Sequence, residues 1–294
     1  MTMLREFLDI TRDSSGLFQG LAIMDTEYAA CINSRPVLYF TFKNCRARTA
    51  AELVETIRRE ICEEYIRYEQ AIRALEKEES YEARMLLETA EAVMTPMAPP
   101  IKVEAAIETL LRIVKRYYGR QHRLSVDGID GQQPDPIQAE AAFIRPVLLI
   151  DEYDQPIMSS YEYGYHEELG TFFTNLYGMA MKGNDALDQA LLTGVQRVVK
   201  ESIFSQFNNP KVYTVFNRQY ASSFGLTEEE TGEPVQVWLT LDTSYAERDS
   251  DASLWGLFVN AGYLTVIKRM DADSAVVRIP NEEVMSEFRN LVSE

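Results

Sequence analysis

The run Val147-Leu-Leu-Ile150-Asp151-Glu152-Tyr153-Asp154 decides the fold of this chain. Four successive apolar residues are typical of a strand that is buried on both faces, as in a parallel sheet covered by helices. Two carboxylates follow at once, so the strand delivers them to its carboxyl end, where ligands of open α/β sheets bind. The run therefore predicts an inner strand of an α/β sheet with an acidic site at its tip.

This pattern has the form of a Walker B strand. In that interpretation Asp151 holds Mg²⁺ through water, and Glu152 orients or deprotonates the water that attacks the γ-phosphate of ATP. The alternative is a strand that ends in an acidic loop, because hydrophobic runs followed by acids are common. The pattern by itself leaves both interpretations open.

Strand-like and helix-like segments alternate on both sides of this run. β-rich or apolar stretches predict strands, the first two of them buried, at residues 36–42, 190–193 and 211–216. Amphipathic spacing predicts helices at residues 1–10, 50–79, 81–94, 103–118, 162–182 and 197–205. A polar stretch predicts a surface loop over residues 120–142. The alternation implies βαβ units and a mainly parallel sheet.

The character of the chain changes after Gly225. The segments that follow predict a small winged-helix-like α+β module with a helix at residues 254–261, a hairpin of residues 263–267 and 275–279, and a last helix from Asn281. We therefore expect two domains, an α/β core over residues 1–225 and a helical and hairpin module over residues 226–294.

Composition limits the classes of function. With 29 Lys and Arg against 46 Asp and Glu, the formal net charge is −17, which argues against direct nucleic-acid binding or an anionic membrane surface. The three cysteines form no C-x-x-C pair, as in a reduced cytoplasmic protein. No apolar stretch approaches the roughly 20 residues that span a bilayer. We expect a soluble, cytoplasmic protein.

Two more residues are candidates for the acidic site. Thr193 places a hydroxyl at a strand end, where a sensor contacts the γ-phosphate, although a structural turn gives the same pattern. Arg197 can reach a phosphate, or it lies on a helix surface and pairs with Glu201 four residues on. A basic cluster is more consistent with a solvated helix end than with a phosphate site. It consists of Arg112, Lys115, Arg116, Arg120 and Arg123.

The phosphate cradle of an ATPase is missing from these residues. A P-loop needs G-x-x-x-x-G-K-[ST], because glycines allow close backbone approach and the lysine contacts the β- and γ-phosphates. None of the 14 glycines here is followed by Lys. We therefore expect this chain by itself to hydrolyse little or no ATP.

The chain resembles the bacterial AAA-ATPase-like family, whose P-loop ATPase domain is often fused to a PD-(D/E)XK nuclease domain. The matching segments follow the family's order: MLREFLDI (3–10), Leu17–Ile23, Pro36–Lys43, LLIDEYDQPI (148–157), LLTGVQRVVKESIFSQFNN (191–209), FGLTEEE (224–230), LWGLFVNAGYL (254–264) and IPNEEV (279–284). The resemblance implies a three-layer P-loop-type sheet, ATP and Mg²⁺ as cofactors, and Walker B roles for Asp151 and Glu152.

The chain also departs from the family's pattern. In the family a strand and an R-P-R-R-F-G-K-[ST] loop precede the MLREF helix, so we expect a sheet that lacks its Walker A strand, with a gap between residues 190–193 and 211–216. The match covers no nuclease domain. Three interpretations follow: a truncated ATPase, a non-catalytic module that binds a protein partner or self-associates, and a decayed fragment of an ATPase–nuclease protein.

Overall fold

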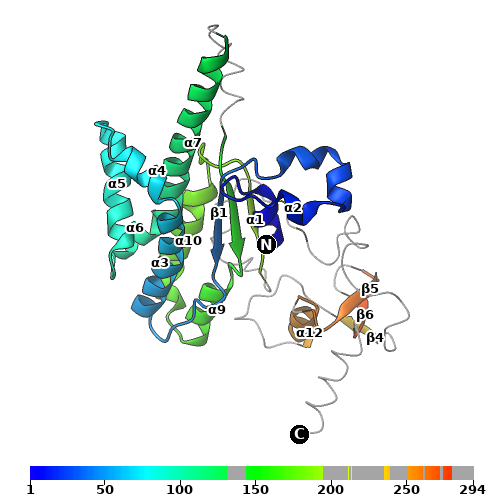
Figure 1. Ribbon diagram of the computed structural model, residues 1–294. Coiled ribbons are helices and arrows are strands. Elements are labelled where there is room, and N and C mark those ends of the chain that lie inside the picture. Colours follow the sequence, from blue (N-terminus) through cyan, green and yellow to red (C-terminus); the bar gives the residue numbers. More distant parts are fainter. Residues whose placement is uncertain are drawn as a thin grey trace. The chain divides into compact units, whose positions relative to one another are not determined.

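The computed structural model describes residues 1–130, 144–194, 211, 213, 235–238, 251–260, 262–271 and 274–279. The chain divides into two compact units, the first built mainly from Met1–Gly194 and the second mainly from Asn209–Glu294. Figure 1 shows both units, and each is described here by itself. The domain boundary expected at residue 225 lies outside the described residues.

A three-stranded parallel sheet lies at the centre of the first unit. Its strands, in spatial order, are β1 (Val37–Thr41), β2 (Val147–Asp151) and β3 (Ala190–Leu192). The register pairs Thr41 with Asp151 and Ile150 with Leu192, so the three strands end at one common edge. The predicted parallel α/β sheet is confirmed, and the acidic strand is its buried middle strand.

One face of this sheet is covered by α1 (Thr2–Leu8). The contact is an apolar cluster of Met1, Leu4 and Leu8 from the helix with Val37, Tyr39, Val147 and Leu149 from the strands. The end of α1 is bonded to the residues before β1, because the amide of Arg35 donates to the carbonyl of Leu8 at 2.9 Å. The helix therefore runs antiparallel to β1. No side chain caps the start of α1.

Long amphipathic helices cover the opposite face, as Figure 1 shows in blue, cyan and green. These helices and the shorter ones packed around them are α3 (Ala50–Arg67), α4 (Glu69–Leu75), α5 (Tyr81–Met94), α6 (Pro100–Glu104), α7 (Ala106–Asp130) and α10 (His166–Met181). Leu38 and Phe40 of β1 are buried beneath them. Helix, sheet and helix layers together enclose the core of the unit, while short helical turns lead from α1 to β1 at Ser15–Phe18, Ala22–Asp25 and Glu27–Cys31.

Two helix predictions need correction. The helix expected over residues 50–79 divides at Tyr68, whose hydroxyl bonds the carbonyl of Val37 at 2.9 Å. The helix expected over residues 103–118 divides at Ala105 and continues to Asp130, so the first half of the predicted loop over 120–142 is helical. A single glycine costs a helix interior only about 1 kcal/mol relative to alanine, which the long helix tolerates.

The strand predicted at residues 190–193 is confirmed as β3, but the prediction that it is buried is wrong. Ala190 is exposed and Leu191 is 42% exposed, because β3 is the outer strand of the described sheet. An additional helix, α9 (Gln155–Glu162), was not expected and begins directly after the acidic run. The helix predicted at 197–205 lies outside the described residues, and so does most of the strand predicted at 211–216.

The second unit contains a small antiparallel sheet. Its strands, in spatial order, are β4 (Val235–Trp238), β6 (Ser274–Arg278) and β5 (Thr265–Arg269). The predicted hairpin and the predicted helix, α12 (Asp251–Asn260), are confirmed, whereas β4 was not foreseen. The last helix expected, from Asn281, lies outside the described residues. Throughout the ranges described, every helix is too short or too polar to cross a bilayer.

Candidate functional site

The carboxyl edge of the parallel sheet brings two predicted residues together. Asp151 is the last residue of β2, and Thr193 directly follows β3. The Thr193 hydroxyl donates a hydrogen bond of 2.5 Å to Oδ1 of Asp151. Oδ2 of Asp151 accepts no hydrogen bond from the described residues. Arg197, the fourth predicted residue, lies outside the described part of the chain.

The backbone of Thr193 is fixed by bonds on both of its sides. Its amide donates to the carbonyl of Ile150 at 2.9 Å, and its carbonyl accepts from the amide of Tyr153 at 3.1 Å. Together with the hydroxyl, these bonds attach the end of β3 to the end of β2 at three points. The position of the Thr193 side chain beside Asp151 is therefore fixed by the backbone bonds between β2 and the residue after β3.

Gly194 fits this junction because it has no side chain. A Cβ atom there would lie 2.6 Å from Oδ1 of Asp154 and 2.8 Å from Cε1 of Tyr153, closer than real contacts allow. Asp154 is only 2% exposed and occupies the N-cap position of α9, yet its side chain makes no capping bond there. Its carboxylate instead packs against the backbone after β3. Neither Gly194 nor Asp154 was predicted as part of the site, although a glycine directly after Thr193 indicates a close backbone approach.

Glu152 has a backbone that side chains rarely adopt. Its φ is 52°, in the left-handed region, because the chain must turn sharply between β2 and α9. The direction of its side chain is therefore set by the turn and not by the alternation of the strand. Such a conformation costs about 1–3 kcal/mol and is concentrated at functional sites. No described residue bonds to the Glu152 carboxylate, so it is available to a water molecule.

The turn is supported from the core by Tyr177 of α10. The hydroxyl of this fully buried residue donates to the carbonyl of Tyr153 at 2.8 Å, and the two rings meet edge to face. Burial raises the pKa of Tyr177 well above its ordinary value, so the hydroxyl remains a proton donor at neutral pH. The acidic turn therefore rests on a rigid part of the core.

The oxygen donors of this edge suit magnesium. Mg²⁺ usually keeps several waters and is held by one or two carboxylates together with phosphate oxygens. Asp151 supplies one such carboxylate, with Oδ2 directed to no protein donor among the described residues. The described residues contain no group of three or more His, Cys, Asp or Glu side chains that could hold a metal ion. The residues present thus fit a hydrated ion better than a metal caged by protein.

A model of a protein family described as a predicted AAA-ATPase matches residues 1–204. The chain belongs to this AAA-ATPase-like family. The match includes Asp151, Glu152, Thr193 and Arg197, so the whole predicted site lies within the family's region. The search of curated proteins and the search of solved structures each gave no match.

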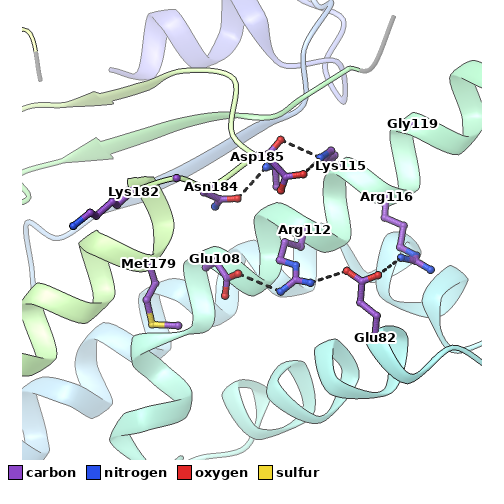
Figure 2. A pocket seen from close by; sticks show the side chains of 12 residues that line it. Glu82, Glu108, Arg112, Lys115, Arg116, Gly119, Met179, Lys182, Asn184 and Asp185 are labelled. Carbon is purple, nitrogen blue, oxygen red and sulfur yellow. Dashed lines mark hydrogen bonds and ion pairs between the residues drawn. The ribbon is translucent and has the colours of Figure 1, made fainter. Parts of the chain in front are cut away.

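A separate pocket of this AAA-ATPase-like chain lies away from the acidic edge, between α5, α7 and the loop after α10 (Figure 2). Its volume is about 550 Å³. Glu82 accepts hydrogen bonds from Arg112 at 2.6 Å and from Arg116 at 2.8 Å. The bond from Arg112, and after it the bond from Arg116, lowers the pKa of Glu82. Asp185 likewise pairs with Lys115 at 2.8 Å. These cations are paired with the protein's own acids.

Proposed function

We propose that this AAA-ATPase-like chain carries the metal- and water-positioning half of an ATP site. The observation that carries the proposal is the hydrogen bond between Thr193 and Asp151, which joins a carboxylate and a hydroxyl at the carboxyl ends of neighbouring parallel strands. Ligands of open α/β sheets bind at that edge.

Each residue would have a distinct task. Oδ1 of Asp151 accepts the hydrogen bond from Thr193, and Oδ2 would accept one from a magnesium-bound water. Glu152, held at positive φ and without a described partner, accepts a hydrogen bond from the attacking water and can take its proton. Thr193 is the candidate sensor. Because its hydroxyl has a single proton, it would have to turn away from Asp151 to donate to a γ-phosphate oxygen. Arg197 is a further candidate for phosphate contact. Bound Mg²⁺ would supply charge stabilisation on the phosphate oxygens.

Hydrolysis also needs a phosphate cradle, and the 294 residues contain no G-K-[ST] sequence. In the family's pattern that loop precedes the helix that corresponds to α1. The 294-residue chain should then bind nucleotide weakly and hydrolyse ATP no faster than background.

Binding of Mn²⁺, a spectroscopic substitute for Mg²⁺, tests this proposal. Electron paramagnetic resonance of free Mn²⁺ should reveal one weak site that Asp151→Asn abolishes. Asp188→Asn is the matched control. Asp188 lies just before the start of β3, at the other end of the strand from Thr193, and its carboxylate pairs with Arg35 at 3.6 Å. Equal affinity in the wild type and in Asp151→Asn would contradict the proposal. Magnesium-dependent ATP turnover by the chain, lost in Glu152→Gln, would refute the expected lack of hydrolysis.

A second function, a protein-interaction module, is favoured by β3. This strand is apolar, it forms the outer edge of the described sheet, and Leu191 is 42% exposed. Uncovered strand edges are templates for pairing with another chain. We propose a protein partner or a second copy at this edge. Self-association that Leu191→Ser reverses, followed by analytical ultracentrifugation, would support the module, and a monomer at all concentrations would exclude a second copy.

We also propose that the second unit is a winged-helix-like module, on the basis of α12 and the β5–β6 hairpin. A cytoplasmic location is supported by the three free cysteines.

A further inference from the structure

The turn after β1 carries three exposed cations, Lys43, Arg46 and Arg48. We propose that this cationic turn binds the phosphate groups of a nucleotide at the same sheet edge as Asp151. The inference rests on the proposed function, because it names further contacts for the ligand of that site. No Asp or Glu lies between Lys43 and Arg48, in a chain whose net charge is −17.

The side chains of the three cations have no ionic or hydrogen-bond partner among the described residues. Most other cations of the first unit do form ion pairs, as Arg73 does with Glu69 at 2.6 Å. An anion that binds the cationic turn therefore displaces no internal partner, whereas one entering the pocket of Figure 2 would have to break ion pairs.

The backbone of the turn is fixed at several points. Phe42 donates its amide to the carbonyl of Asp151 at 2.9 Å, and Cys45 donates to the carbonyl of Phe42 at 2.8 Å. The Ala47 amide donates to Ser159 at 3.2 Å, and its carbonyl accepts from the hydroxyl of Tyr165 at 2.7 Å. Because the turn is already ordered, binding an anion costs little backbone entropy.

The cationic turn and Asp151 lie at the same edge of the sheet, because the amide of Phe42 donates to the carbonyl of Asp151. Side chains alternate along a strand, and one face carries the cluster under α1, which includes Val37, Tyr39, Val147 and Leu149. Asp151 continues that face on β2. Phe42 is buried on the opposite face, where its ring lies 6.4 Å from that of Tyr177. Lys43 follows in the turn after β1, beside the strand that ends at Asp151.

The chemistry of this arrangement suits a polyphosphate. A lysine ammonium binds phosphate as a point charge, and arginine can bind it with two parallel bonds. Cations at this edge would supply the positive charge that a P-loop lysine provides, which these residues lack. The net charge of −17 repels a triphosphate. Binding at the cationic turn should therefore be weak and sensitive to salt.

Binding of tripolyphosphate and of ATP to the 294-residue chain in EDTA tests the inference. Isothermal titration calorimetry at low ionic strength would compare the wild type with the triple variant Lys43→Gln, Arg46→Gln, Arg48→Gln. A control with the same change of charge on helices α4, α5 and the loop between them is Arg73→Gln, Lys77→Gln, Arg84→Gln. Lys43→Arg keeps the charge and should retain binding.

We expect the cationic-turn variant to bind both ligands at least about tenfold more weakly and the control to bind nearly as the wild type does. Equal losses in both variants, or no binding by the wild type at millimolar ligand, would overturn the inference. An oligonucleotide that binds the same cations more tightly than tripolyphosphate would overturn it in favour of nucleic acid. The Mn²⁺ titration is independent of these cations, so failure there concerns the proposed function alone.

Discussion

Replacement of Glu152 by glycine should stabilise the protein while removing a proposed functional group. Glu152 has a φ of 52°, and a left-handed backbone costs a residue with a Cβ atom roughly 1–2 kcal/mol. Glycine avoids that cost but loses about 0.5–1 kcal/mol of chain entropy on folding. The net gain in the free energy of unfolding is then about 0–1.5 kcal/mol.

Equilibrium unfolding in urea would measure this gain, and the melting temperature should rise by a few degrees, since about 1 kcal/mol shifts it by roughly 2–4 °C in domains of this size. Glu152→Ala keeps the strained backbone and should change stability little. Met97→Gly is the matched control, because Met97 has a φ of 60° and is 73% exposed. It should give a similar gain.

Asn33→Gly should behave in the opposite way. Its φ is 47°, but its side chain donates to the carbonyls of Glu6 at 3.1 Å and Asp9 at 3.0 Å. Losing these bonds outweighs the relief of strain. If Glu152→Gly instead lowered stability by about 1 kcal/mol while Met97→Gly raised it, Glu152 would be making a stabilising contact, and the reasoning from strain would fail.

Two further predictions concern buried groups. Arg67→Met leaves the fully buried carboxylate of Asp9, now 2.9 Å from the guanidinium, without its main partner, and should cost about 3–5 kcal/mol in urea unfolding. Arg73→Met, at an exposed pair, should cost less than about 1 kcal/mol, and similar losses in the two variants would contradict this ranking. Burial, together with nearby Glu60, raises the pKa of Cys45 to about 12, so its thiol should react with a thiol reagent only after unfolding. Labelling of all three cysteines in the native protein at neutral pH would disprove that.

Local patterns predicted the elements of the first unit well where packing agreed with them. The helix expected at residues 81–94 is α5 (Tyr81–Met94), and the apolar run before Asp151 is a buried middle strand. Patterns failed where a long-range contact decided the outcome. The hydroxyl of Tyr68 bonds the carbonyl of Val37, thirty-one residues away in the chain, and the helical spacing of residues 50–79 contains no trace of that contact.

The candidate site was predicted in part. Asp151 and Thr193 were named because each ends an apolar run, and the parallel register brings them within 2.5 Å. The roles predicted for them, for Glu152 and for Arg197 stay predictions. The close approach of Gly194 to Asp154 was not foreseen, because it joins residues forty apart in the sequence.

The sequence by itself determined the class of fold and the acidic tip of one strand, because side-chain periodicity and the order of strands and helices are local properties of a chain. Only the tertiary structure decided which carboxylate oxygen faces a hydroxyl, that Glu152 is held at positive φ, and that the turn after β1 meets the end of β2 at Asp151. Those features depend on how strands distant in sequence pair, and pairing is settled by burial of the whole core.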